Sequence, residues 1–300
     1  MSDATPTTDG EETASTGDAG SNDTDRPADG ESAAPELVGE ALAVGYPGTE
    51  EPVVECETLV LPRGEVTALV GPNGSGKSTL LKALSNRLDP ETGSVVLDGT
   101  EVQSFGSKEL ARKLGLLSQE NESPGSLTVE ELVHHGRYPH RGFFDSVDET
   151  DRRAVERALE LAGVEDLRDR PMDGLSGGQK QLAWIAMALA QDTDVLLLDE
   201  PTTYLDLHHQ LRVMEVLRTL VDVREVTIGV VLHDIGQAAR FADNLVAMKD
   251  GEPYDWGPPR KVVDEALLRD VFRVEADVDV DHPTGPHVSP HRALDETEGR

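Results

Sequence analysis

A glycine-rich segment, Gly71 to Thr79, constrains the fold of this chain more than any other feature. It follows the apolar run Val66 to Val70 and leads into the helix-like run Leu80 to Leu84. Glycines let such a loop curl until several N–H groups converge, and the next helix adds positive charge at its N-terminus. A strand, a glycine loop and a helix in this order predict a polyphosphate cradle, the alternative being a glycine-rich turn that matches by chance.

Different residues of this segment are expected to bind different parts of a nucleotide and its metal ion. Lys77 is predicted to reach the β- and γ-phosphates, and the Ser78 hydroxyl to complete the shell of a Mg²⁺ ion. The other residues expected to contact the nucleotide are Gly71, Pro72, Asn73, Gly74, Ser75, Gly76 and Thr79.

The charge balance limits the partners of this chain. It holds 58 Asp and Glu against 27 Lys and Arg, a formal net charge of -31. This excess of carboxylates argues against a nucleic-acid-binding surface and predicts a single deep cationic site. The same excess fits a halophile, because a salty cytoplasm screens self-repulsion. The alternative is that the acidic residues gather in disordered ends.

Both ends of the chain are expected to lie outside the folded part. Residues 1–35 have almost no large apolar side chain, which predicts a disordered acidic tail. They lack the basic start and apolar core of a signal peptide, so the folded part, residues 36–275, is expected to stay in the cytoplasm. Residues 276–300 turn to Asp, His, Pro and Gly, and this composition predicts a loose tail.

Neither a disulfide nor a membrane span is expected. Cys56 is the only cysteine, which excludes an internal disulfide and agrees with a reducing compartment. Apolar stretches such as Val226 to Leu232 are far shorter than the roughly 18 to 20 residues that cross a bilayer.

The order of predicted elements indicates an α/β protein with a helical insertion. Short β-like runs occupy residues 36 to 99, and Asp98-Gly99 signals a hairpin. Helical periodicity without clear strands follows from about 120 to 190. The alternation then resumes with a buried strand at 195–199, a helix from about 207, a strand at 226–232 and a helix near 235–242, as in a mostly parallel sheet.

Two adjacent carboxylates, Asp199 and Glu200, end the apolar strand that starts at Val195. Ligands of open parallel sheets bind at the C-terminal ends of strands. Asp199 is predicted to hold Mg²⁺ through its water shell and Glu200 to polarise the water that attacks the γ-phosphate. Alone, such a pair is usually a strand that meets solvent.

A second anion site is predicted at Ser176, Gly177, Gly178 and Gln179. Ser176 precedes a long helical run and is well placed as its N-cap, while the glycines leave N–H groups bare. One chain cannot easily fold both phosphate sites onto one nucleotide, but two chains related by a two-fold axis could each lend this site to the other's ATP. An ordinary capped helix is the alternative.

Together these segments resemble the ATP-binding subunit of an ATP-binding cassette (ABC) transporter. The resemblance covers roughly residues 36 to 274, in the family's order. The matching segments are the Walker A loop at 71–79, the Q-loop at Gln119, the signature at 175–179, Walker B at 195–200, the D-loop at 205–206 and the switch histidine His233. It implies a P-loop NTPase (RecA-like) α/β core with an antiparallel β subdomain and an inserted α-helical subdomain.

The resemblance also implies roles for three further side chains. Tyr46 should stack on adenine, His233 should contact the γ-phosphate, and Gln119 should link the metal and the attacking water to the membrane partner. With Glu200 and Lys77, His233 and Gln119 complete the expected catalytic set. Without the family, these residues would be read as a turn tyrosine, a strand-end histidine and a loop amide.

Residues 107–113, 133–140 and 200–210 narrow the resemblance to importers of iron siderophores, haem and cobalamin. It implies a homodimer that hydrolyses ATP at the cytoplasmic face of the membrane, bound to a permease fed by a substrate-binding protein. The alternatives are the subunit of a metal-ion importer or an exporter, and a soluble ABC protein outside transport. The resemblance places the histidines at 134, 135 and 140 in the helical region that faces the permease, and those at 282, 287 and 291 are expected to lie in a solvated tail. Neither group is expected to bind a metal.

Overall fold

A six-stranded sheet forms the centre of the computed structural model, which describes residues 36–49, 51–119, 126–142 and 146–295. The strands lie in the order β10-β9-β3-β8-β7-β6, and all pairs except β10 with β9 are parallel. Their bounds are β3 Val66–Val70, β6 Leu114–Leu117, β7 Val195–Asp199, β8 Thr227–Val231, β9 Asn244–Lys249 and β10 Glu252–Gly257. Strands β3, β7 and β8 are buried along their whole length, as their continuous apolar sequences predict.

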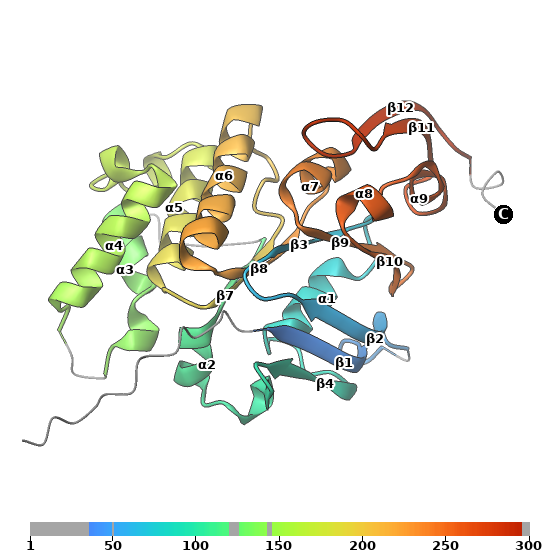
Figure 1. Ribbon diagram of the computed structural model, residues 1–300. Helices are drawn as coiled ribbons and strands as arrows, with labels where there is room; N and C mark the ends of the chain where they lie inside the picture. Colours follow the sequence, from blue (N-terminus) through green and yellow to red (C-terminus); the bar gives the residue numbers. More distant parts are fainter. Residues whose placement is uncertain (1–35, 50, 120–125, 143–145, 296–300) are drawn as a thin grey trace, which may run out of the picture. The chain divides into compact units, whose positions relative to one another are not determined.

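The sheet separates two hydrophobic cores, because side chains alternate between its faces. In β7, Val195 and Leu197 belong to one core, whereas Leu196 and Leu198 belong to the other. The first core is shared with a second sheet and helix α1, and the second with helices α3 to α7 (Figure 1).

The second sheet is antiparallel, with strand order β2-β1-β4-β5. The bounds are β1 Leu37–Val44, β2 Val54–Leu61, β4 Thr92–Leu97 and β5 Thr100–Glu101. The hairpin predicted at Asp98-Gly99 is confirmed, since Leu97 pairs with Thr100. Helix α1, Lys77–Leu84, lies between the two sheets and buries Leu80, Leu81 and Leu84 there.

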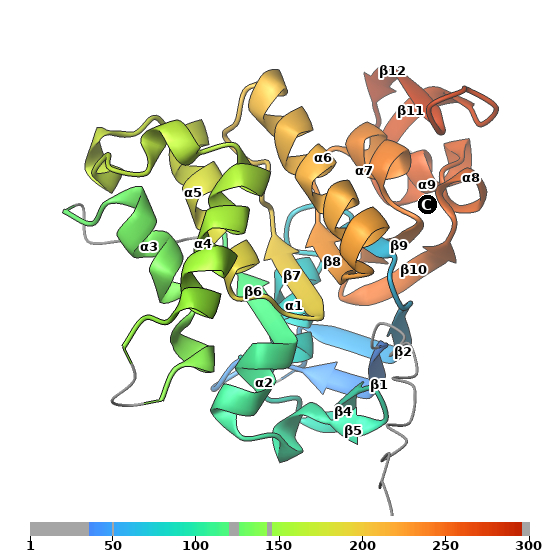
Figure 2. The same cartoon turned by 60° about the vertical axis from the view of Figure 1, so that its left-hand side comes forward.

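The predicted helical insertion is confirmed for the described residues between 126 and 190. It holds α3 Val129–His135, α4 Glu149–Ala162 and α5 Gly177–Ala190, with one-turn 3-10 helices at Tyr138–His140, Glu165–Leu167 and Met172–Gly174. In Figure 2 these helices lie together beside β6, the edge strand of the large sheet. Helix α2, Ser107–Lys113, is followed by β6, and a further 3-10 turn, Val102–Ser104, precedes it.

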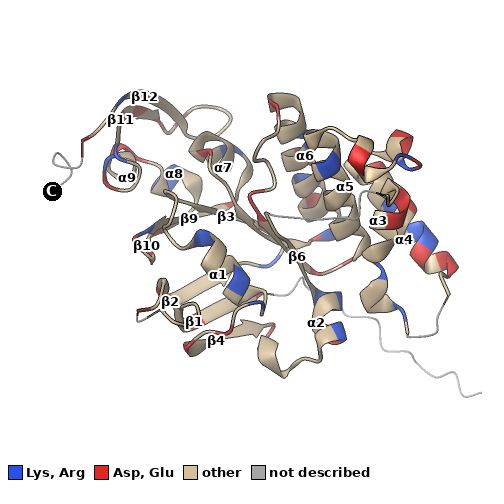
Figure 3. Ribbon diagram, turned by 180° about the vertical axis from the view of Figure 1, so that it is seen from behind, with Lys and Arg blue, Asp and Glu red and all other residues tan. Residues whose placement is uncertain are grey.

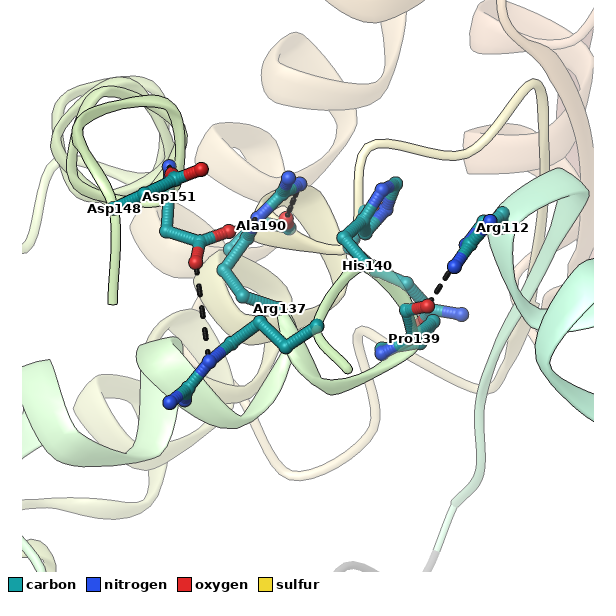
Figure 4. Close-up of polar contacts among 9 residues, drawn as sticks. Arg112, Arg137, Pro139, His140, Asp148, Asp151 and Ala190 are labelled. Atoms are coloured by element: carbon teal, nitrogen blue, oxygen red, sulfur yellow. Dashed lines mark hydrogen bonds and ion pairs between the residues drawn. The ribbon is translucent and has the colours of Figure 1, made fainter. Parts of the chain in front are cut away.

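Polar contacts of the turn around Tyr138–His140 join the helical insertion to the core (Figure 4). Arg137 Nε donates to Asp151 Oδ1 at 2.9 Å, and its Nη1 donates to the carbonyl of Ala190 at 2.9 Å. From the core side, Arg112 Nε donates to the carbonyl of Pro139 at 2.8 Å. Arg137 is 3% exposed, and its charge is compensated by Asp151, so it forms a buried ion pair and not a site for an anion.

The second half of the core follows the predicted alternation. Helix α6, Leu207–Arg224, precedes β8, and α7, Ile235–Phe241, follows it. Two short helices, α8 (Pro259–Val262) and α9 (Glu265–Asp270), follow β10 along the chain.

The prediction of a loose tail at residues 276–300 was wrong for the part that the structure describes. Strand β11, Val274–Asp279, pairs with β12, His287–Ala293, as an antiparallel hairpin. Val278 and Val288 pack against the core of the large sheet. Gly285 has φ of +104°, and a Cβ there would lie 2.6 Å from the carbonyl oxygen of Ala239, so the loop approaches α7 as only glycine allows. The predicted acidic tail, residues 1–35, lies outside the described residues.

Candidate active site

The glycine loop lies between β3 and α1, as the sequence predicts. Gly71, Gly74 and Gly76 have φ of 148°, 81° and 93°, which lets the backbone fold back on itself. A Cβ on Gly71 would lie 2.3 Å from the carbonyl oxygen of Met248, and one on Gly76 would lie 2.5 Å from Val54 Cγ2. No side chain caps the start of α1, so its first N–H groups remain available for an anion.

Lys77 is held inside this loop. It is 5% exposed, and its Nζ donates to the carbonyls of Gly71 and Pro72 at 2.9 and 2.8 Å. Burial lowers the pKa of the ammonium, while the nearby carboxylates of Glu200 and Asp199 oppose this shift. The third contact of Nζ is the neutral Ser75 Oγ at 3.5 Å, and a buried cation bound to neutral oxygens inside a curled backbone is prepared to receive phosphate oxygens.

The side-chain oxygens of Ser78 and Asp199 lie together and could bind a cation. Ser78 Oγ donates to Asp199 Oδ1 at 2.9 Å, which joins the first turn of α1 to the C-terminal end of β7. Burial raises the pKa of Asp199, opposed in part by the bond from Ser78. A hydroxyl and a carboxylate beside a phosphate cradle fit Mg²⁺, which prefers a few protein oxygens and completes its shell with phosphate and water.

The Glu200 carboxylate collects donors from different elements. Gln119 Nε2 donates to Oε2 at 2.6 Å, and His233 Nε2 lies 2.6 Å from Oε1. Thr203 Oγ1 donates to Oε2 at 3.2 Å. Glu200 has φ of 52°, which turns the chain sharply after β7 and directs the carboxylate toward these partners.

One cavity of about 420 Å³ joins these groups. It brings together most of the predicted loop with Gln119, Glu200 and His233, whereas Asp199, Gly71, Pro72 and Ser75 are outside its lining and Asp199 is bonded to Ser78. Its lining is Val53, Asn73, Gly74, Gly76, Lys77, Ser78, Thr79, Gln119, Glu200, Thr203, Tyr204 and His233.

Tyr46 lies next to α1 and outside this lining. Its hydroxyl is 3.3 Å from Thr79 Oγ1, and Lys82 Nζ lies 5.8 Å from the centre of its ring. The ring is 39% exposed, so one side is open to solvent. The stacking of adenine on Tyr46 stays a prediction.

The Ser176 segment forms the predicted helix cap and does not line the cavity. Ser176 Oγ accepts the N–H of Gln179 at 3.3 Å, and Gln179 Oε1 accepts the N–H of Ser176 at 3.1 Å. The glycines between them, Gly177 and Gly178, open helix α5. Within the described residues, therefore, one protomer keeps its two predicted phosphate sites apart.

Sequence reasoning missed Thr203 and Tyr204. Tyr204 is 95% exposed with φ of 63°, and both residues line the cavity. The run Glu200-Pro-Thr-Thr-Tyr contributes to the family resemblance, and its proline and polar residues are also typical of a turn beside the carboxylates.

The six histidines considered in the sequence analysis form no metal centre among the residues that the structure describes. No group of three or more His, Cys, Asp and Glu side chains there could hold a metal ion. His140 Nε2 lies 2.6 Å from the carbonyl of Gln191, and His291 Nε2 lies 2.9 Å from Asp277 Oδ2. Over the same described ranges, no helix combines the length and apolarity that crossing a bilayer requires.

A glycine loop with a buried lysine, a serine–aspartate pair and a carboxylate at the end of a parallel strand define a P-loop nucleotide-binding protein. The family model described as "ABC transporter" matches residues 57–203. The petrobactin import ATP-binding protein FpuD of Bacillus anthracis is 46% identical over 240 residues, which are 80% of this chain and 88% of that protein.

Two solved structures share the fold. An inward-facing metal-chelate type ABC transporter superposes with a TM-score of 0.72 at 26% identity, over 86% of this chain and 98% of that chain. The dimeric ABC transporter cassette MJ0796 superposes with a TM-score of 0.66 at 30% identity, over 74% of this chain and 98% of that chain. This chain therefore belongs to the ABC transporter family, as an ATP-binding subunit of the siderophore, iron-hydroxamate and cobalamin importer type. Members of this family hydrolyse ATP.

Proposed function

We propose that this chain hydrolyses ATP to drive uptake of an iron chelate, or of cobalamin, through a separate membrane permease. The observation that carries the proposal is the single cavity that holds Lys77, Ser78 and Glu200, with Asp199 bonded to Ser78. The similar protein named for petrobactin import and the metal-chelate type transporter support the choice of cargo.

Lys77 would bind the β- and γ-phosphates by exchanging its bonds to the Gly71 and Pro72 carbonyls for bonds to phosphate oxygens. Charge-assisted bonds of this kind are stronger than bonds to neutral carbonyls, so the exchange favours the nucleotide. The bare N–H groups at the start of α1 would bind the remaining phosphate oxygens.

Ser78 and Asp199 would hold Mg²⁺, with Gln119 as a third ligand. The ion would supply charge neutralisation at the phosphates. The amide nitrogen of Gln119 donates a hydrogen bond to Glu200, so the amide oxygen of Gln119 is the atom that would face the metal.

Glu200 would orient the water that attacks the γ-phosphate and accept its proton, with ADP as leaving group. Its carboxylate is already fixed by three donors, so little reorganisation is needed at the moment of reaction. His233, on the opposite side of this carboxylate from Gln119, would reach the γ-phosphate once nucleotide enters the cavity.

Two copies would close around two ATP molecules. The Ser176 and Gly178 site of each chain stays apart from its own cavity, and this separation is the reason to assign it to the partner's nucleotide. The similar cassette MJ0796 is described as dimeric. The ATPase would act at the cytoplasmic face of the membrane, its helical subdomain at about 120–190 contacting the permease, which receives cargo from a substrate-binding protein.

Nucleotide binding tests the site. Lys77→Ala is expected to reduce the affinity for a fluorescent ATP analogue by about a hundredfold, because one charge-assisted contact is lost and its buried space is left empty. The matched control is Lys261→Ala, an exposed lysine on α8. Equal affinity in both variants would refute the cradle.

Reconstitution tests the cargo. The chain with its permease and binding protein in lipid vesicles is expected to hydrolyse ATP faster when a ferric siderophore is added than when free Fe³⁺, Zn²⁺ or Mn²⁺ is added. Stimulation by the free ions alone would favour a metal-ion importer. Failure to copurify with any polytopic membrane protein would favour the soluble alternative.

A further inference from the structure

The imidazole of His209, at the start of α6, lies directly against Gly178 at the start of α5. A Cβ built on Gly178 would lie 3.0 Å from Cγ, 3.1 Å from Cδ2 and 3.2 Å from Nδ1 of that ring. A Cβ on the neighbouring Gly177 would meet nothing within 4 Å. The ring therefore covers one of the two signature glycines and leaves the other open.

Asp206 fixes the position of this ring. Asp206 Oδ1 accepts the backbone N–H of His209 at 2.9 Å and lies 2.8 Å from its Nδ1. These bonds lower the pKa of Asp206, so the carboxylate remains ionised and accepting. The histidine side chain is 26% exposed, and the ring of His208 meets it edge-on with centres 5.4 Å apart.

The residues between Glu200 and Asp206 connect this pair to the cavity. Thr203 Oγ1 donates to the Glu200 carboxylate, and Gln210 Nε2 donates to the carbonyl of Leu205 at 3.0 Å. Gln210 follows His209 on the same helix. A short, internally bonded turn thus runs from the carboxylate of the protomer's own site to the imidazole that touches Gly178.

We propose that His209 is a positioning residue that couples the two ATP sites of the dimer. Each protomer would contribute Gly178 to the ATP site of its partner and Glu200 to its own ATP site. His209 would keep the positions of these two residues linked. This inference rests on the proposed function. A shift of the 200–206 turn on binding of nucleotide would move Asp206, and the imidazole would transmit the shift to the first turn of α5 through van der Waals contact.

The contact itself is tested without nucleotide. Gly178→Ala is expected to lower the melting temperature in the wild-type chain, because the methyl group pushes the ring from Asp206. In the His209→Ala background the same change is expected to leave or raise the melting temperature, since alanine favours the helix. Gly177→Ala serves as the control and should behave alike in both backgrounds. Equal effects of Gly178→Ala in both backgrounds would overturn the proposed contact.

The coupling is tested by steady-state ATPase of the full chain over a range of ATP concentrations. His209→Ala is expected to reduce kcat by about fivefold or more and to move the Hill coefficient toward 1, with unchanged affinity of the monomer for a fluorescent ATP analogue. His209→Asn is expected to restore much of both, because its amide nitrogen can replace Nδ1 as donor to Asp206.

Different failures of these tests lead to different conclusions. Wild-type kcat and Hill coefficient in His209→Ala, or no recovery in His209→Asn, would overturn the coupling role. A Hill coefficient of 1 for ATP hydrolysis by the wild-type chain would also overturn the coupling role, because the two sites would then act independently. Failure of the proposed function would instead appear as unchanged nucleotide binding in Lys77→Ala, while the melting-temperature cycle would still report on the contact.

Discussion

At the scale of single residues, the Glu200 carboxylate is the group around which the site is arranged. Its two oxygens accept bonds from Gln119, Thr203 and His233, which come from three separate segments of the chain. Such convergence fixes a carboxylate more firmly than any one bond could. Its orientation is therefore set before the nucleotide arrives.

Glu200→Gln is expected to retain ATP binding and to slow turnover by about a hundredfold or more, because the amide cannot accept the proton of the attacking water. The trapped ATP should hold two copies together, which size-exclusion chromatography with ATP and Mg²⁺ would reveal as a dimer. Glu57→Gln, an exposed position on β2, is the control. Normal turnover in Glu200→Gln would remove the residue from this role.

Asp199 illustrates a conflict between stability and function. Burial raises its pKa, so the folded chain binds more protons than the unfolded chain at pH values between the ordinary and the raised pKa. Stability therefore falls as pH rises through this window, and the penalty persists at neutral pH. Asp199→Asn should raise the melting temperature at pH 7 and flatten its pH dependence in the range just above the ordinary pKa of Asp, about 4, while abolishing Mg²⁺-dependent hydrolysis. A lower melting temperature at pH 7 would contradict this account.

Sequence spacing predicted the part of the cavity that depends on local order. A strand, a glycine loop and a helix place Lys77 and Ser78 by themselves, and a buried strand places Asp199 at its end. Thr203 and Tyr204 could not be placed in this way, because their positions depend on positive φ values at Glu200 and Tyr204, which no periodic pattern records.

At the scale of elements, the buried pair of Arg137 and Asp151 holds α3, α4 and α5 together (Figure 4). Their side chains are 4% and 6% exposed, so the two opposite charges compensate each other away from water, with Arg141 Nε as a second, more distant cation 3.9 Å from Asp151 Oδ2. The sequence did not indicate this pair, since neither residue belongs to a repeating pattern. The hairpin at β11 and β12 was missed for a similar reason, because Val278 and Val288 pair only across a long polar loop.

Arg137→Met is expected to destabilise the chain by about 3 kcal/mol, because it leaves the buried Asp151 carboxylate with only the more distant cation of Arg141, whose Nε lies 3.9 Å from Oδ2. Adding Asp151→Leu should recover a large part of this loss. Urea unfolding followed by circular dichroism measures both. The control is Arg153→Met, which breaks an exposed pair with Glu149 and should cost at most about 0.5 kcal/mol. If Arg137→Met were as stable as Arg153→Met, the Arg137–Asp151 pair would contribute little to stability.

At the scale of the whole molecule, the acidic excess is spread over the described residues and not confined to one end. Residues 1–35 contain nine of the 58 Asp and Glu and one of the 27 Lys and Arg, so most of the net charge lies elsewhere. In Figure 3 the ribbon of α4 carries both acidic and basic positions and that of α3 acidic positions, while the strands of the large sheet carry few charged positions. Among the described residues the buried charged side chains are Lys77, Arg137, Asp151 and Asp199, so most of the charge acts from the surface.

Self-repulsion of this surface predicts that salt stabilises the chain. Raising NaCl from about 0.1 M to about 1 M shortens the Debye length from roughly 10 Å to roughly 3 Å, which screens like charges on neighbouring elements. The melting temperature should rise by several degrees, about as much as 1 to 2 kcal/mol would produce in a domain of this size. A chain that lacks residues 1–35 should keep most of this gain, because it keeps most of the charge. Loss of the gain in the shortened chain would assign the effect to the acidic N-terminal residues, and no gain in either would show that the surface carboxylates are already far enough apart.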